Sequence, residues 1–159
     1  MAKMKLPDES DRIRANTNEE INRRIDRDIE DNIRYYATQN EKALTERIDS
    51  LEDEWDVDRL VQLCISGASI SSILLGVFGS KKWWLIAAAG MGLLGNHAVN
   101  GWCPSAMVFR RMGFRTRQEI DREKYALKAI RGDFDELTQF DNTKLDEKVL
   151  AAIDAVKSL

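Results

Sequence analysis

The chain lacks most of the residues from which common catalytic and metal-binding sites are built. Its 159 residues include one histidine, two cysteines and two prolines. Two cysteines are too few for the disulfide scaffold of a small secreted domain. Together with one histidine they also lack the spacing of a known zinc motif. No phosphate-binding glycine loop, Ser-His-Asp set or pair of inward-facing carboxylates is evident. We therefore expect no enzyme, no metal and no cofactor.

Charged side chains are missing from two long stretches. Asp, Glu, Lys and Arg do not occur in residues 60–79 or 83–102. Each run has about 20 residues, enough for a helix rising about 1.5 Å per residue to cover the roughly 30 Å core of a bilayer. A helix of a soluble protein normally keeps a charged stripe toward water. Because only residues 80–82 separate the runs, we predict an antiparallel transmembrane hairpin. The alternative is a buried hairpin in a soluble helical bundle.

Outside the hairpin the composition favours helices, since proline and glycine are scarce there. The predicted fold class is an all-α membrane protein, a two-span hairpin with amphipathic cytoplasmic helices on both sides. The expected parts are a loosely ordered segment 1–16, amphipathic helices in 17–58, the hairpin in 59–109, and a basic segment with C-terminal helices in 110–159.

Two capping boxes mark expected helix starts. Thr17-x-x-Glu20 and Thr116-x-x-Glu119 each place a hydroxyl three residues before a carboxylate, ahead of apolar residues at helical spacing. The second predicted helix runs to about Arg131. The narrow apolar stripes of these charged helices favour packing against one another, as in a helical hairpin or coiled coil.

Basic residues near the two runs predict the orientation in the membrane. The connector contributes Lys81 and Lys82. Seven arginines flank the opposite ends: Arg47, Arg59, Arg110, Arg111, Arg115, Arg117 and Arg122. By the positive-inside rule both termini are expected in the cytoplasm.

The basic block after the second run also suggests a partner. A cluster of arginines just after a membrane helix favours anionic lipid head groups. The predicted head-group contacts are Arg110, Arg111, Arg115 and Arg117. Acidic segments flank this short block, so nucleic acid is not expected as a partner.

Small residues recur at spacing four in both runs, where they would let helix backbones approach each other in lipid. The predicted packing residues are Ala68, Ser72 and Gly76 on the first run and Ala88 and Gly92 on the second. We favour packing within one hairpin over pairing of two hairpins, because the short connector already holds the two runs adjacent.

Polar groups inside the runs are the remaining candidates for chemistry. Cys64, Asn96, His97 and Asn100 are predicted to form an intramembrane polar cluster. Cys103 is the candidate reactive thiol, since nearby arginines or His97 would favour a thiolate. The alternative is structural: Cys103 ends the helix and Cys64 fills space as a small apolar residue.

Several motifs in 55–115 resemble one known family. They are Asp58-Arg59-Leu60, Trp83-Trp84, Leu93-Leu94, Gly101-Trp102-Cys103-Pro104 and Arg110-Arg111-Met112-Gly113. This set resembles the YgaP-like transmembrane domain family, and the region 116–134 resembles extensions found in some members. The resemblance implies a two-helix module of the bacterial inner membrane, which in the namesake anchors a rhodanese sulfurtransferase and is associated with dimerisation. No rhodanese domain is present here, so sulfurtransferase activity is not implied.

The sequence thus predicts a small non-enzymatic protein of the bacterial inner membrane that acts as an anchor or interaction module. Its expected partners are the lipid bilayer and either a second copy or an unidentified membrane protein. The alternative function is a membrane thiol carrier in sulfur or redox handling that uses Cys103.

Overall fold

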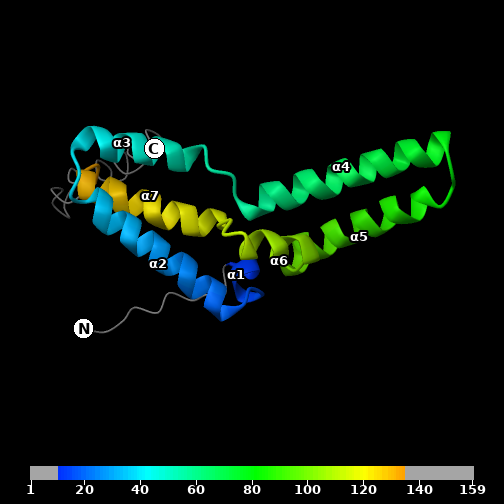
Figure 1. Cartoon of the computed structure of the whole chain (residues 1–159), viewed down its shortest axis with the longest axis horizontal. Coiled ribbons are helices and arrows are strands. Elements are labelled where there is room, and N and C mark those ends of the chain that lie inside the picture. Colours follow the sequence, from blue (N-terminus) through cyan, green and yellow to red (C-terminus); the bar gives the residue numbers. More distant parts are fainter. Residues whose placement is uncertain (1–10, 135–159) are drawn as a thin grey trace, which may run out of the picture. The chain divides into compact units, whose positions relative to one another are not determined.

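The computed structural model describes residues 11–134, and every regular element in that range is an α-helix (Figure 1). The helices are α1 Arg12–Ala15, α2 Glu19–Tyr36, α3 Glu41–Glu52, α4 Val57–Phe78, α5 Trp83–Asn100, α6 Pro104–Arg111 and α7 Arg117–Arg131. The all-α prediction is confirmed for this part of the chain. The C-terminal helices expected beyond residue 134 lie outside the described residues.

The chain forms two compact units, which we describe separately. The hairpin unit consists of the described part of Met1–Asp28 together with Glu54–Ile120. The arm unit consists of Ile29–Asp53 and the described part of Asp121–Leu159. Helices α2 and α7 each contribute residues to both units. This division differs from the predicted order of parts, because residues 11–28 belong to the same unit as the hairpin.

The two capping boxes had different outcomes. At α7 the Thr116 amide donates to Glu119 Oε2 at 2.9 Å, and the Glu119 amide lies 3.4 Å from Thr116 Oγ1, so this box is confirmed. At α2 the box prediction is wrong by one residue. Asn18 Oδ1 accepts from the Glu20 amide at 2.8 Å, while Thr17 Oγ1 donates to the Ile13 carbonyl. The side-chain oxygen of Asn18 therefore accepts from the Glu20 N–H group that the Thr17 hydroxyl was predicted to cap.

Helices α4 and α5 run antiparallel and side by side (Figure 1). The inward faces follow a repeat of three and four residues, as the 3.6-residue helical turn requires. The seam residues are Val61, Ile65, Ser69, Ser72 and Gly76 on α4, and Ala87, Gly90, Leu94 and His97 on α5.

Two glycines let these helices approach closely. A Cβ added to Gly76 would lie 2.8 Å from Trp84 Nε1, and one added to Gly90 would lie 2.7 Å from Ser69 Oγ. Ser72 and Gly76 are buried at the seam, where the sequence placed them. The remaining three predicted packing residues, Ala68, Ala88 and Gly92, are exposed.

The predicted packing stripes are therefore corrected. A strict spacing of four drifts around a helix with 3.6 residues per turn, so only part of it stays at the seam of α4. On α5 the predicted Ala88 is one residue, or about 100° of rotation, from the buried Ala87, and Gly92 is two residues from both Gly90 and Leu94. Gly92 has no atom within 4 Å of an added Cβ.

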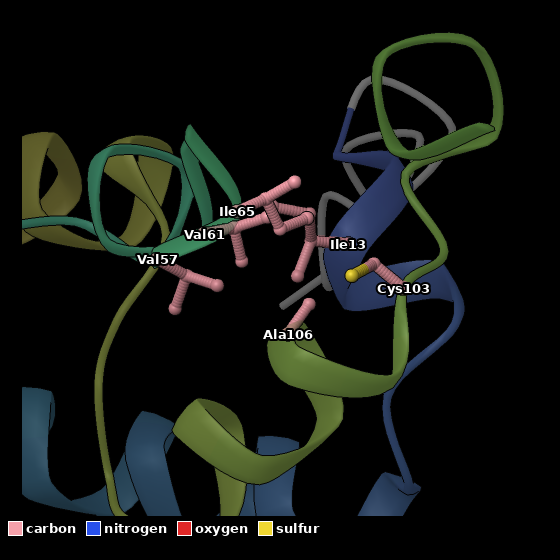
Figure 2. Packing of buried hydrophobic residues seen from close by; sticks show 6 residues of the cluster. All are labelled: Ile13, Val57, Val61, Ile65, Cys103 and Ala106. Carbon is pink, nitrogen blue, oxygen red and sulfur yellow. The ribbon is translucent and has the colours of Figure 1, made fainter. Parts of the chain in front are cut away.

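A hydrophobic core lies where the hairpin meets α1 and α6 (Figure 2). Ile13 of α1 points toward Val61 and Ile65 of α4 and toward the Cys103 sulfur. Val57 and Val61 have no exposed surface and Ile13 has 6%. The expectation of a loosely ordered segment up to residue 16 is thus wrong for residues 11–16, because Ile13 is held in this core.

The arm unit has its own core on α2, α3 and α7. Ile29, Leu44, Ile48, Leu51 and Leu127 are buried there. An ion pair adds to this packing: Arg47 donates from Nε and Nη2 to Glu123 Oε1 at 2.9 and 2.8 Å. The predicted packing of the amphipathic stripes matches these helices.

Candidate functional site

The C-terminal end of α5 is closed by the N-terminal segment of the chain. Arg12 Nη1 donates to the carbonyls of Ala98 at 3.2 Å and Val99 at 2.6 Å. Asn16 Nδ2 donates to the Asn100 carbonyl at 3.0 Å. The last carbonyls of a helix have no partner within the helix and carry partial negative charge. A cationic and an amide side chain from a distant part of the chain therefore cap α5.

Gly101 makes this docking possible. Its φ of 67° is in the left-handed region, and its amide donates to the His97 carbonyl at 2.8 Å. A Cβ at this position would lie 2.5 Å from Arg12 Cβ and 2.8 Å from the Arg12 carbonyl carbon. Only glycine satisfies both the conformation and the close approach.

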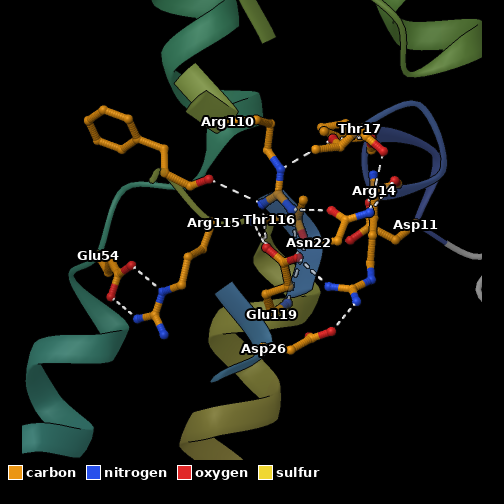
Figure 3. A network of polar contacts seen from close by, with 12 residues as sticks. Asp11, Arg14, Thr17, Asn22, Asp26, Glu54, Arg110, Arg115, Thr116 and Glu119 are labelled. Carbon is orange, nitrogen blue, oxygen red and sulfur yellow. Dashed lines mark hydrogen bonds and ion pairs between the residues drawn. The ribbon is translucent and has the colours of Figure 1, made fainter. Parts of the chain in front are cut away.

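Beside this docking site, a buried ion cluster joins the N-terminal segment, α2, α6 and α7 (Figure 3). Arg110 and Glu119 form a two-bond pair, Nη1–Oε2 at 2.5 Å and Nη2–Oε1 at 2.8 Å, and neither residue has exposed surface. Arg14 donates to Glu119 Oε1 at 2.7 Å and to Asp26 Oδ2 at 2.5 Å. These two arginines and two carboxylates sum to zero formal charge.

The remaining donors of Arg110 are also satisfied. Its Nε donates to Thr17 Oγ1 at 3.3 Å, Nη1 to the Phe114 carbonyl at 3.1 Å, and Nη2 to Asn22 Oδ1 at 2.8 Å. A buried guanidinium is tolerated only when its N–H groups have acceptors. Arg110 therefore serves as a structural hub rather than as a surface charge.

The ion pairs of the cluster shift the pKa values of Glu119 and Arg14. Burial alone would raise the pKa of Glu119, but bonds and charges from Arg110, the Thr116 amide and Arg14 outweigh it and hold the pKa below its ordinary value. For Arg14, burial would lower the pKa, yet Asp26 and Glu119 raise it overall. Both shifts favour the charged forms of Glu119 and Arg14 in the folded state.

The predicted head-group contacts are corrected by these interactions. Arg110 is fully buried and Arg115, which is 8% exposed, pairs with Glu54, its Nε donating to Oε1 at 2.8 Å. Neither can reach a lipid surface. Arg111 is exposed and Arg117 is partly exposed. Local charge counting missed the distant carboxylates that neutralise two of the four arginines.

The predicted intramembrane polar cluster is brought together only in part. Asn100 Nδ2 donates to Asn96 Oδ1 at 2.8 Å, and Asn96 Nδ2 donates to the Trp102 carbonyl at 2.7 Å, so these amides close the end of α5. His97 lies on the inner face, where Nε2 is 3.0 Å from Asp58 Oδ1. Cys64 is exposed on α4 and belongs to neither arrangement.

Cys103, the candidate reactive thiol, is 1% exposed in the core beside Ile13 and Ala106. Its Sγ lies 2.7 Å from Ser105 Oγ, which makes a hydrogen bond within the first turn of α6. Ordinary buried cysteines behave as small hydrophobic residues. Its burial agrees with a structural role, but Cys103 does not end α5 as the structural alternative expected: α5 ends at Asn100, and Cys103 is the residue before α6.

A cavity of about 370 Å³ lies within the hairpin unit, next to the docked N-terminal segment. It is lined by Asp11, Arg12, Ile13, Asp58, Gln62, Leu94, His97, Ala98, Gly101, Thr116, Arg117 and Gln118. Among these, the sequence analysis proposed only His97 and Arg117 as site residues, because the segments that build the cavity are far apart in the chain.

Comparisons with known proteins add no homologue: no protein-family model, curated protein or solved structure matches the chain. The resemblance to the YgaP-like transmembrane domain family stays an expectation.

Proposed function

We propose that this protein is a non-enzymatic, two-span membrane protein in which the α4–α5 hairpin is the anchor and the arm unit binds a partner. The observation that carries the proposal is the outward face of the hairpin. In the described residues, Glu41–Phe78 is the one helical stretch long and apolar enough to cross a membrane, and only 28% of its apolar window is buried. The core helix of a soluble protein would be mostly buried.

The exposed side chains of both helices support the same proposal. Large hydrophobic residues that face outward include Ile70, Leu74, Leu75, Val77 and Phe78 on α4 and Leu85, Ile86, Met91 and Val99 on α5. A soluble monomer rarely exposes so continuous an apolar surface. Lipid is the surrounding in which these side chains are stable.

Although α5 does not reach the hydropathy of a span by itself, contacts at the base favour two crossings. Residues before α4 bond to residues after α5, as Arg14 does to Glu119 and Asp11 to Thr116. A bilayer cannot separate groups in hydrogen-bond contact. If α4 crosses the membrane, α5 therefore returns, and Asn96, His97 and Asn100 lie near its inner end.

The positive-inside rule supports cytoplasmic termini, as in the sequence analysis. The rule acts during insertion, before Arg110 and Arg115 find their carboxylates, so their burial in the folded protein does not change the count. A bacterial inner membrane follows from the family resemblance alone.

Accessibility of the connector tests this topology. We would introduce Ser80→Cys in a Cys64→Ala background and treat intact cells with a membrane-impermeant maleimide. Labelling is expected from outside. Thr38→Cys in the arm unit is the matched control and is expected to label only after lysis. Extraction of the native protein by alkaline carbonate without detergent, or labelling of Ser80→Cys only in broken cells, would contradict the proposal.

The arm unit supplies the interaction half of the proposal. Tyr35, Tyr125 and Ile130 are exposed on its charged helices, and aromatic residues are enriched in protein interfaces. A photo-crosslinker at position 35 is expected to capture one discrete species, a second copy or another membrane protein. If photo-crosslinkers at positions 35 and 125 capture nothing in native membranes, the proposal that the arm unit binds a partner is rejected. The thiol-carrier alternative has no support from the buried Cys103.

A further inference from the structure

The cavity of the hairpin unit contains groups of both charges. Asp58 is its accessible carboxylate: the side chain is 48% exposed, and Oδ1 is bonded to His97. Asp11 lines the same cavity, but its oxygens accept from the Arg14 amide and from the Thr116 hydroxyl. Arg12 and Arg117 also line the cavity, with Thr116 and Gln118 at the start of α7. A ligand that fits must present a cation to Asp58 and an anion to the basic wall.

His97 provides a second, independent indication of a ligand. The residue is 5% exposed, it lines the cavity, and its Nδ1 has no hydrogen-bond partner in the part of the chain that the structure describes. A carboxylate only accepts, so the bond to Asp58 places a proton on Nε2, and Nδ1 of a neutral imidazole is then an acceptor. Buried polar atoms almost always have a partner. A ligand N–H group would supply the missing donor.

The position of the cavity narrows the ligand class. Asp58 and Arg59 are the last charged residues before the uncharged part of α4, and Leu94, Ala98 and Gly101 are at the end of α5. Trp102 follows at 44% exposure, as is usual at the level of lipid head groups. Ile13, Leu94 and Ala98 give the cavity an apolar side. The volume of the cavity is within the roughly 300–1,000 Å³ of known small-ligand pockets.

We propose that this cavity binds the phosphoethanolamine head group of a zwitterionic phospholipid. The ammonium group bonds Asp58, the phosphate faces Arg117 and the N-terminus of α7, and the glycerol carbons contact Leu94 and Ala98. This inference rests on the proposed membrane function, since the lipid must be present at that depth. An anionic lipid without an amine has no cation to pair with the Asp58 carboxylate. A choline head group has no N–H to donate.

Lipid retention by the purified full-length protein tests the proposal. We would exchange the detergent-solubilised protein into nanodiscs of phosphatidylethanolamine, phosphatidylcholine or phosphatidylglycerol and count retained lipids by native mass spectrometry. Phosphatidylethanolamine is expected to be retained best. Asp58→Asn is expected to lower its affinity about tenfold, which is the effect of losing one charge-assisted hydrogen bond. Arg59→Gln, which removes the neighbouring exposed charge, is the matched control and is expected to leave retention unchanged.

A second variant and a competition experiment test the same proposal independently. Gln62→Leu changes the cavity wall without removing a charge and is expected to weaken retention even if Asp58→Asn fails to fold. Soluble glycerophosphoethanolamine should compete only weakly if the lipid is the source, and full competition would overturn the lipid assignment. Equal retention of the three lipids, or a preference for phosphatidylglycerol, would overturn the head-group site. If the protein is not membrane-integral at all, carbonate extraction detects that failure separately.

Discussion

Along most of their length, α4 and α5 pack through small residues, with Gly76 against Trp84 and Gly90 against Ser69. Where the N-terminal segment, α6 and α7 meet, Arg110, Glu119 and Arg14 are held by hydrogen bonds and charge instead. The seam is local, since a short connector brings its two sides together. The ion cluster is not, because Arg14 and Glu119 are 105 residues apart in sequence. Substitutions in the seam and in the ion cluster are expected to change the free energy of unfolding by different amounts.

The largest effect is expected from the hub of the cluster. Arg110→Met leaves Glu119 buried without its two-bond partner, and removal of one member of a buried pair costs about 3–5 kcal/mol. Arg111→Met, at the exposed neighbouring position, should change stability by less than about 0.5 kcal/mol. Thermal or denaturant unfolding of the full chain in detergent measures both. Equal, small effects would show that the cluster contributes little.

A smaller effect is expected at the seam. Gly76→Leu forces the Trp84 side chain away and should destabilise the hairpin by about 1–3 kcal/mol through overpacking. Gly92→Leu places its side chain in open space and should leave unfolding almost unchanged. Gly92 decides between the seam described here and the stripe predicted from sequence, because Gly76 belongs to both. A larger loss at Gly92 than at Gly76 would reverse the assignment.

Acid should weaken the cluster before it weakens the seam. The pKa of Glu119 is held below its ordinary value of 4.5, so its contribution is complete above that pH and is lost as pH falls through the lower, folded value. Unfolding midpoints measured from about pH 6 down to about pH 3 should therefore decline. The decline should be smaller in Arg110→Met, where the lowered pKa has lost its main cause. The same slope in both proteins would mean that other carboxylates control acid stability.

The smallest effect is expected in the arm unit. Arg131 and Asp133 form a pair near the surface, with Nη2–Oδ2 at 2.5 Å and side chains 23% and 20% exposed. The hydrogen bond from Arg131 lowers the pKa of Asp133 despite some burial. Pairs near solvent contribute about 0.2–1 kcal/mol. A double-mutant cycle with Arg131→Gln and Asp133→Asn should return a coupling in that range, and a coupling as large as the Arg110 loss would contradict it.

The sequence predicted features that depend on neighbouring residues. The Thr116 capping box lies within four residues of chain, and its hydrogen bonds form as expected. Helices α4 and α5 begin and end within a few residues of the uncharged runs, because loss of charge and helical periodicity are local properties. The start of α2 was missed by one residue, since Asn18 and Thr17 are both acceptable caps.

Features that depend on distant residues could not be predicted from one sequence. Nothing around Arg110 or Arg115 indicates that Glu119 and Glu54 will pair with them. The only local sequence feature that relates to the docking of Arg12 on the end of α5 is the glycine at position 101. The phase of the α4–α5 seam was also undetermined, because small residues occur on more than one face of both helices.

The distance in sequence between Arg14 and Glu119 has a consequence for biosynthesis. Ribosomes add about 5–20 residues per second, so Arg14 is made about 5–20 s before its partner. Until residues 98–106 have been made, late in that interval, Arg12 has no finished helix end to cap and the core around Ile13 is incomplete. In the proposed membrane protein, the hairpin would therefore insert while its base is still open, and synthesis of residues 110–119 would complete the base. Under that proposal, a stall in translation between those points would leave an inserted protein whose base has not closed, the form most exposed to proteases and chaperones.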